Sequence, residues 1–254
     1  MQGVILAAGQ GQRLRDPLGR PKCLQRLGGV PLVHHQINAL ASAGVDDVLI
    51  VVGYQQQQVR RAVGAAARFV VNDRFAETNS MYSFLLAADV VDEDVVVMNS
   101  DLFFHPELPA RLLELDGDAL LYDSASGGED EHMKVQVANG HLVEMSKVMD
   151  GARVSGENLG MLHLSAAGVA SAARAGHAIV DAGGEQAWLA TAINSIAVEH
   201  PIRCVDVAGW PWVEIDFPED LWRARAQVFP SVSEAIDQVE LELLGQRELM
   251  GVQS

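Results

Sequence analysis

The 254-residue sequence contains little cysteine and no long apolar segment. Its two cysteines, Cys23 and Cys204, are too few for a disulfide framework, and no Cys-x-x-Cys or Cys/His spacing typical of a zinc site is present. No apolar run approaches the length that spans a bilayer, and the chain passes from Met1 into its first apolar run without a basic segment or a cleavage site. We therefore expect a protein of the reducing cytoplasm.

Basic residues are also scarce. The sequence has 18 lysines and arginines against 34 aspartates and glutamates, which gives a net charge of −16 at pH 7. Such a surface repels nucleic acid and anionic membranes unless a basic stripe offsets it, and the sequence contains no such stripe. We expect neither as a partner. The few cations near the N-terminus stand out for the same reason.

Apolar patterns alternate between strand and helix along the first half of the chain. Residues 45–52 and 69–72 have the pattern of buried strands, and residues 31–43 and 55–66 have the spacing of helices. Short connections between such elements predict an α/β fold: a doubly wound, mainly parallel sheet with helices on both faces, in a Rossmann-like arrangement. From residue 119 onward the strands are shorter, which indicates a small antiparallel region on the substrate side.

The sequence contains no linker or internal repeat that would divide the chain. We expect one domain over residues 1–230, followed by a helical tail over 231–254. Ser233 can cap a helix that carries Ile236 and Leu243 on one apolar stripe. This helix either packs on the domain or mediates self-association, so a homodimer is an open alternative.

The first apolar run begins at Gly3 and ends in a loop that carries glycines and cations. At Gly9 and Gly11 the backbone can turn sharply and approach a ligand closely, and the N–H groups of such a loop suit phosphate oxygens. Arg13 adds a planar fork and Lys22 a mobile point charge. A plain tight turn with solvated cations is the alternative. The joint presence of these residues favours a site that grips a nucleoside triphosphate and stabilises a departing pyrophosphate.

Two better-known phosphate-binding loops are excluded. The dinucleotide fingerprint requires a third glycine where this chain has Leu14, and the P-loop requires a Gly-Lys-Ser/Thr sequence that does not follow Gly11. The loop therefore belongs to another class of nucleotide-binding motif.

Acidic residues follow two predicted strands and indicate a divalent cation. The apolar strand 95–98 stops just before Asp101, and ligands bind beyond the carboxyl ends of strands in an open parallel sheet. A carboxylate there can hold a Mg²⁺ ion that bridges phosphate oxygens, or it can merely cap the next turn. Glu214 and Asp216 are two residues apart, so on an extended strand both carboxylates face the same side. They offer the second half of a Mg²⁺ site.

A group of polar residues precedes a predicted helix near residue 80. Thr78 or Asn79 can cap a helix that begins near Ser80. The same polar groups can also read the edge of a nucleobase. The spacing leaves both interpretations open.

These motifs form an ordered set across residues 3–228. The sequence Leu-Ala-Ala-Gly-x-Gly-x-Arg-Leu at 6–14, followed by Pro21-Lys22, resembles the signature of the sugar-phosphate nucleotidyltransferase superfamily. Five later segments resemble its cytidylyltransferase branch, which includes bacterial phosphocholine and phosphonate cytidylyltransferases. They are Asn-Asp at 72–73, Glu-Thr-Asn-Ser-Met-Tyr-Ser at 77–83, Met-Lys-Val at 133–135, Glu-Met-Ser-Lys at 144–147, and Glu-Ile-Asp at 214–216 before Pro-Glu-Asp-Leu at 218–221.

The resemblance implies a transfer of CMP from CTP to a small acceptor, with Mg²⁺ as cofactor and pyrophosphate as product. The residues implied to bind the nucleotide are Leu6, Ala7, Ala8, Gly9, Gly11, Thr78, Asn79, Ser80 and Ser100, with Arg13 and Lys22 as catalytic cations at the triphosphate. The residues implied to hold Mg²⁺ are Asp101, Asp216 and Glu214. Lys134 and Lys147 would contact the phosphate or phosphonate of the acceptor. On its strand pattern alone Lys134 can reach an anionic ligand or face solvent, and an exposed lysine is the commoner case.

The acceptor is less well determined by the sequence. A choline head requires an aromatic cage, for which the candidates are Tyr82, Trp188, Trp210 and Trp212. A 2-aminoethyl- or 2-hydroxyethylphosphonate requires a carboxylate or hydroxyl partner, such as Glu185 on a helix predicted over 185–196. We favour the phosphonate, with phosphocholine and a sugar 1-phosphate as alternatives.

A noncatalytic, nucleotide-binding regulatory domain is the alternative outside enzymes. The intact Arg13, Lys22, Asp101 and Asp216 speak against it. An acceptor of these classes has an oxygen that is already anionic at neutral pH, so its attack requires no general base. This agrees with the absence of a convincing catalytic triad from the sequence.

Overall fold

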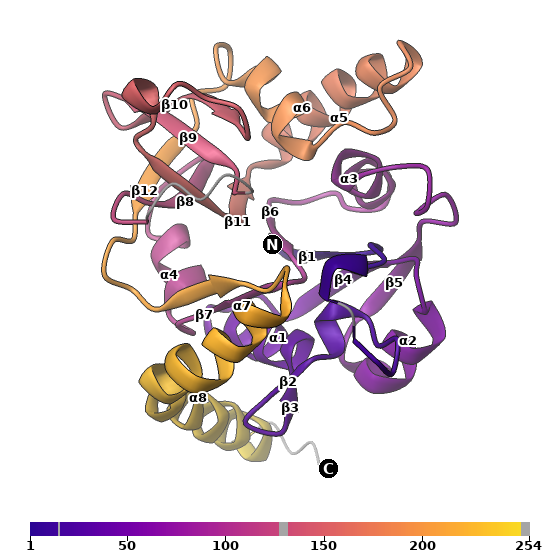
Figure 1. Ribbon diagram of the computed structural model, residues 1–254, viewed down its shortest axis with the longest axis vertical. Coiled ribbons are helices and arrows are strands. Elements are labelled where there is room, and N and C mark those ends of the chain that lie inside the picture. The colour runs from indigo at the N-terminus through magenta and orange to yellow at the C-terminus, as the bar shows by residue number, and fades with distance from the viewer. Residues whose placement is uncertain (15, 127–131, 250–254) are drawn as a thin grey trace.

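The computed structural model describes residues 1–14, 16–126 and 132–249. A nine-stranded sheet with the order β5-β4-β1-β6-β11-β8-β12-β10-β9 forms its centre (Figure 1). The strands are β1 (Gln2–Ala7), β4 (Asp47–Val52), β5 (Arg68–Val71), β6 (Val95–Asn99), β8 (Ala119–Asp123), β9 (Lys134–Ala138), β10 (His141–Ser146), β11 (Gly156–Leu164) and β12 (Arg203–Asp206). The four strands β5, β4, β1 and β6 are parallel, whereas β11 runs antiparallel to β6, β8 and β9. The predicted α/β class, with its mainly parallel part and its antiparallel region, is confirmed.

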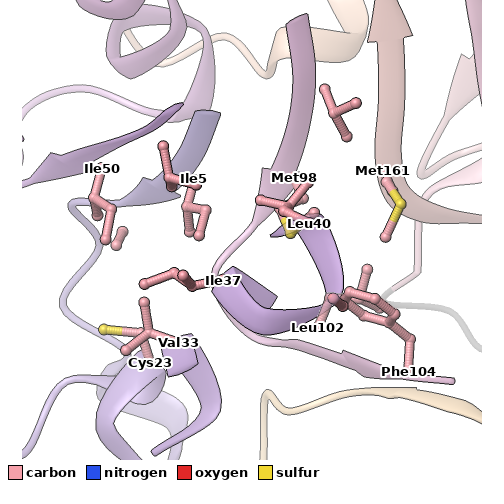
Figure 2. Close-up of a cluster of buried hydrophobic side chains, with 14 of the residues drawn as sticks. Ile5, Cys23, Val33, Ile37, Leu40, Ile50, Met98, Leu102, Phe104 and Met161 are labelled. Carbon is pink, nitrogen blue, oxygen red and sulfur yellow. The ribbon is translucent and has the colours of Figure 1, made fainter. Parts of the chain in front are cut away.

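Helices cover both faces of the sheet because its central strands are apolar on both sides. The helices are α1 (Leu32–Ser42), α2 (Gln56–Val63) and α4 (Leu108–Leu113) on one face, and α3 (Ser80–Ala88), α5 (Ala166–Asp181) and α6 (Leu189–Ile196) on the other. Successive strand residues point to opposite faces. Ile5, Ile50 and Met98 lie on the α1 face, where Figure 2 shows them opposite Val33 and Ile37. Their neighbours Val4, Leu49 and Val97 belong to the second core, beneath α3 and α6.

One predicted helix begins later than the sequence suggested. Residues 185–196 have a helical apolar spacing, but α6 starts at Leu189, and Trp188 occupies its N-cap position in an extended conformation. Turns lie at residues 182–183 and 185–186 instead, and Gly183 adopts a φ of +89°. Glu185 and Trp188 therefore precede the helix on which we expected them.

A two-stranded ribbon lies apart from the main sheet and was not predicted as a pair. Strand β7 (Leu102–Phe104) pairs antiparallel with β13 (Trp212–Glu214), and Glu214 lies opposite Leu102. Each strand has three residues, too short for the apolar alternation of either to be recognised. Because of this pairing, Glu214 and the residues after it lie near the end of β6.

The C-terminal segment packs on the domain. Helix α7 (Pro218–Arg223) is followed by one π-helical turn and by α8 (Phe229–Leu249), so the helix expected within 231–254 starts at residue 229. Val232, Ile236 and the Phe229 ring join a third apolar cluster with Leu27, and α8 contacts α1. No helix among the described residues is long and apolar enough to cross a membrane.

We expect Ile236→Ala to lower the free energy of unfolding by about 2–4 kcal/mol, because it removes a buried side chain from the contact between α8 and the domain. Leu241→Ala on the same helix is the matched control. Its side chain is 70% exposed, so its effect should stay within about 0.5 kcal/mol. Denaturant unfolding followed by circular dichroism measures both. Equal effects of the two substitutions would contradict the packing of α8.

Candidate active site

A cavity of about 490 Å³ opens beyond the carboxyl ends of β1 and β6. Residues from the loop after β1, the start of α3, β11, α6 and the end of β13 line it. Most of the residues predicted to bind nucleotide line this cavity, namely Leu6, Ala8, Gly9, Gly11, Arg13, Lys22, Thr78, Asn79 and Ser80. Ala7 and Ser100 do not. Ala7 is buried, and the backbone N–H of Ser100 donates to the Leu6 carbonyl at 3.3 Å.

The two predicted cations meet the predicted carboxylates directly. Lys22 Nζ lies 3.0 Å from Asp101 Oδ2 and also donates to Asp216 Oδ1. Arg13 Nη2 lies 2.6 Å from Asp216 Oδ2. Burial disfavours the charged form of Lys22, but Asp101 and Asp216 outweigh burial and hold the lysine pKa above its ordinary value. Burial likewise raises the pKa of Asp216, but Lys22, Arg13 and Lys147 outweigh it and lower that pKa overall.

The three predicted metal ligands form one cluster. Oxygen atoms of Asp101, Glu214 and Asp216 lie within 4.8 Å of one another. Burial, and after it the charges of Asp101 and Asp216, raises the pKa of Glu214 to about 8. Asp101 Oδ1 is buried and has no hydrogen-bond partner among the described residues. Converging carboxylate oxygens, one of them unsatisfied, suit a hard divalent cation such as Mg²⁺.

Two further residues hold these carboxylates in place: Gln36, which was not predicted for the site, and Asp220, which was predicted only as part of the 218–221 motif. Gln36 on α1 is fully buried, and its Nε2 donates to the carbonyls of Asn99 (2.9 Å) and Leu102 (2.8 Å), which flank Asp101. Asp220 Oδ2 accepts hydrogen bonds from the backbone N–H groups of Asp216 (3.0 Å) and Phe217 (2.8 Å). The available signal for Gln36 was a polar residue within the apolar stripe of a helix.

Asp16 holds together the loop that precedes Lys22. Its carboxylate accepts hydrogen bonds from Gln25 Nε2 (2.7 Å), the Leu18 N–H (2.7 Å) and the guanidinium of Arg20 (2.9 and 3.1 Å). Burial opposes its ionisation, but these hydrogen bonds outweigh burial and hold the pKa of Asp16 at about 2. Asp16 was not among the residues predicted for the site.

The polar residues before α3 serve as a helix cap and also line the cavity. Asn79 Oδ1 accepts from the N–H of Ser80 at 2.8 Å, and α3 begins at Ser80 as predicted. Asn72 Nδ2 donates to Thr78 Oγ1 at 3.0 Å and to Ser83 Oγ at 3.1 Å. Because all five side chains line the cavity, the two interpretations of this segment are compatible.

The predicted acceptor residues divide into two groups. Lys147 and Trp188 line the cavity, and Lys147 Nζ lies 4.3 Å from the centre of the Trp188 ring. Lys134 and Glu185 do not line it. Lys134 is buried rather than exposed to solvent, and its Nζ donates to the backbone carbonyl of Lys147 at 3.1 Å. The carboxylate of Glu185 lies 3.8 Å from Arg74 Nη2.

Replacement of Asp16 by asparagine should lower the free energy of unfolding by about 1–2 kcal/mol at pH 7. The folded-state pKa of about 2 lies below the ordinary 3.8, so the ionised Asp16 stabilises the fold fully above about pH 4. This stabilisation is lost as the pH falls toward 2. Unfolding in urea at pH 7, 4 and 3 should therefore show the two proteins converging. Asp46→Asn, at an exposed aspartate, is the control. If the effect of Asp16→Asn on the free energy of unfolding did not change with pH, the ionised carboxylate of Asp16 would not be the group that stabilises the fold.

Two curated proteins are similar to this chain in sequence. A bifunctional IPC transferase and DIPP synthase from Rubrobacter xylanophilus is 31% identical over 233 residues, which is 86% of this chain and 50% of that protein. A CMP-5'-(3-aminopropyl)phosphonate synthase from Streptomyces rubellomurinus is 36% identical over 118 residues, which is 44% of this chain and 19% of that protein. The matched segments thus span about half of the first relative and less of the second.

A solved structure and a family model agree with the predicted fold and resemblance. The inositol-1-phosphate CTP transferase from T. maritima aligns with a TM-score of 0.75 and 22% identity over 94% of this chain and 96% of that one, a likeness that shows the fold. The model of the MobA-like NTP transferase domain matches residues 3–153, more than half of the sequence. The resemblance to nucleotidyltransferases is thereby confirmed, and the chain belongs to the family of MobA-like NTP transferase domains.

Proposed function

We propose that this protein is a cytidylyltransferase that transfers CMP from CTP to a phosphonate or phosphate oxygen of a small acceptor and releases pyrophosphate. The observation that carries the proposal is the cluster of Lys22, Arg13 and three carboxylates, which lies within one cavity beside the glycine loop. The names of the Streptomyces and T. maritima proteins support cytidine as the base. For the acceptor, a 2-aminoethyl- or 2-hydroxyethylphosphonate is our starting point.

The proposed reaction is a single in-line displacement. An acceptor oxygen forms a bond to the α-phosphorus of CTP while the bond from that phosphorus to the bridging oxygen breaks, and pyrophosphate leaves with the electron pair. The acceptor oxygen is already anionic, so no residue needs to remove a proton from it.

The residues of the chain would contribute charge and position. Arg13, Lys22 and the amides of the glycine loop would neutralise the charge that develops on the leaving pyrophosphate. Asp101, Asp216 and Glu214 would hold Mg²⁺, which when bound neutralises phosphate oxygens and orients them. Thr78, Asn79 and Ser80 would contact the cytosine.

Pyrophosphate release measured with each nucleoside triphosphate, Mg²⁺ and a panel of phosphonate and phosphate acceptors tests this proposal. We expect release with CTP and one of the acceptors. CTP binding without turnover on any acceptor would instead favour a regulatory nucleotide-binding domain.

We expect Asp101→Asn and Asp216→Asn each to lower kcat by at least about 100-fold, because each removes a carboxylate that holds Lys22 and would hold Mg²⁺ against the phosphates. Glu199→Gln, an exposed acid outside the cavity, is the matched control and should leave kcat unchanged. Steady-state kinetics at saturating CTP measures the effect. Full activity of either aspartate variant would overturn the metal assignment.

A further inference from the structure

Helices α3 and α6 start next to each other, and the first residues of each complete the hydrogen bonding of the other. The first N–H groups of a helix have no partner inside it. The N–H of Asn79, the N-cap residue of α3, donates to the Glu185 carbonyl at 3.1 Å. The N–H of Leu189, the first residue of α6, donates to Ser80 Oγ at 3.0 Å. The starts of the two helices therefore hold each other.

The segment that leads into α6, residues 183–188, takes its position from the same neighbour. No residue of this segment is buried, and it begins with two glycines. An exposed segment of this kind opens at a low free-energy cost unless other contacts hold it. Gln186 Nε2 donates to the Glu77 carbonyl, in addition to the hydrogen bonds that Glu185 and Leu189 make with α3. The start of α3 and the residues before it thus hold the segment in place.

Both helix starts line the cavity, and they carry residues for different substrates. Asn79 and Ser80 belong to the segment that we propose for cytosine. Trp188, the N-cap residue of α6, is one of the residues predicted for the acceptor, and the Lys147 ammonium lies 4.3 Å from the centre of its ring. The hydrogen bonds between the two helix starts therefore join the nucleotide site to an acceptor residue.

A base bound by residues 78–80 would act on Trp188 through these hydrogen bonds. A ligand shifts an equilibrium by the difference between its affinities for the two states. When residues 183–188 open, the N–H of Asn79 loses its partner and residues 78–80 are held less firmly, so a base that requires them in place binds the open state more weakly. Bound nucleotide would therefore stabilise the segment, and with it the position of Trp188.

From this arrangement we infer that Ser80 and Gln186 are positioning residues for the acceptor, through which a bound nucleotide fixes Trp188. The inference rests on the proposed function and adds a second task to Ser80, whose Oγ accepts the first N–H of α6. The coupling is reciprocal, so an acceptor held at Trp188 strengthens the binding of CTP by the same factor. No local sequence pattern indicates this coupling, because the partners in each hydrogen bond are 109 residues apart.

Hydrogen exchange on the intact protein tests the inference with CTP and Mg²⁺ alone. We expect saturating CTP to slow the exchange of the amides of residues 183–190 by at least about 5-fold. Gln186 does not line the cavity, so Gln186→Ala removes the link to Glu77 without removing a contact with the nucleotide. This variant should at least halve the slowing. Gln238→Ala, at an exposed glutamine of α8 whose Nε2 donates to Glu242, is the matched control and should retain the full slowing.

A second variant breaks the other side-chain link. Ser80→Ala removes the acceptor of the Leu189 N–H and should weaken the slowing in the same way. Ser83→Ala is its matched control, because it removes a hydroxyl of the same helix that also lines the cavity but accepts a hydrogen bond from Asn72 instead. Ser80→Thr keeps the hydroxyl and should restore the slowing.

The outcomes separate the inference from the proposed function. Slowing that persists in both Gln186→Ala and Ser80→Ala would come from direct contact with CTP and would overturn the inference. An unchanged exchange rate at residues 183–190 while CTP binds would overturn it too, as would a failure of CTP to bind. Slowing that both variants weaken would support the inference even if no acceptor caused release of pyrophosphate.

If 2-aminoethylphosphonate or phosphocholine is turned over, steady-state kinetics supplies another readout. Gln186→Ala should raise the KM of that acceptor at least about 5-fold, while kcat at saturating concentrations of both substrates changes less than about 2-fold. The reason is that the variant leaves Lys22 and the carboxylate cluster in place. A lower kcat with an unchanged KM would count against a positioning role.

Discussion

The contact of the Lys22 ammonium with Asp101 and Asp216 joins three distant parts of the chain at one point. Each of these side chains is largely withdrawn from water, and an ionised carboxylate in such a place is strongly unfavourable without a compensating charge. The glycine loop, the end of β6 and the segment after β13 therefore reach a stable arrangement only together. Two more residues fix Asp216. Arg13 binds its carboxylate, and the Asp220 carboxylate accepts a hydrogen bond from its backbone N–H.

The sheet explains why this cluster is flanked by two different environments. Toward β1 and α3 the cavity presents glycines and the hydrogen-bonding side chains of Asn72, Thr78 and Asn79. Toward β8, β11 and α6 its lining is mainly aliphatic, with Asn158 on β11 as a polar exception. The two ends of the cavity thus differ in polarity.

The fold and the centre of the site follow from local sequence patterns. Gly9 to Lys22 follows the first apolar run and Asp101 follows the strand 95–98, and the carboxyl ends of parallel strands meet at one edge. Asp216 was predicted from its spacing to Glu214, and the structure brings both to Asp101.

Other features depend on contacts that no local pattern contains. Strands β7 and β13 are short, and their partners lie far apart in the sequence. Gln36 and Asp16 act through hydrogen bonds to backbone groups and side chains that are placed by the fold. Glu185 was expected on a helix that begins only at residue 189, and Lys134 on a strand whose exposed side could not be identified from alternation alone. In physical terms, spacing along the chain determines which side a residue faces within an element, and packing determines what it meets there.

The ribbon of β7 and β13 also brings together the two ends of the stretch between His105 and Pro211, so the length of that stretch can change. The N–H of His105 donates to the carbonyl of Pro211 at 2.9 Å, so the long stretch between these residues leaves and returns at one place. Such a stretch behaves like an insertion into the nucleotide-binding framework, and a change in its length adds little to the entropic cost of closing it. It carries β8, β9, β10, β11, α5 and α6, and with them the part of the cavity lining between Leu120 and Ile193. Exchanging this stretch between related chains would change that part of the cavity lining, while the ribbon kept Leu102 and Glu214 paired.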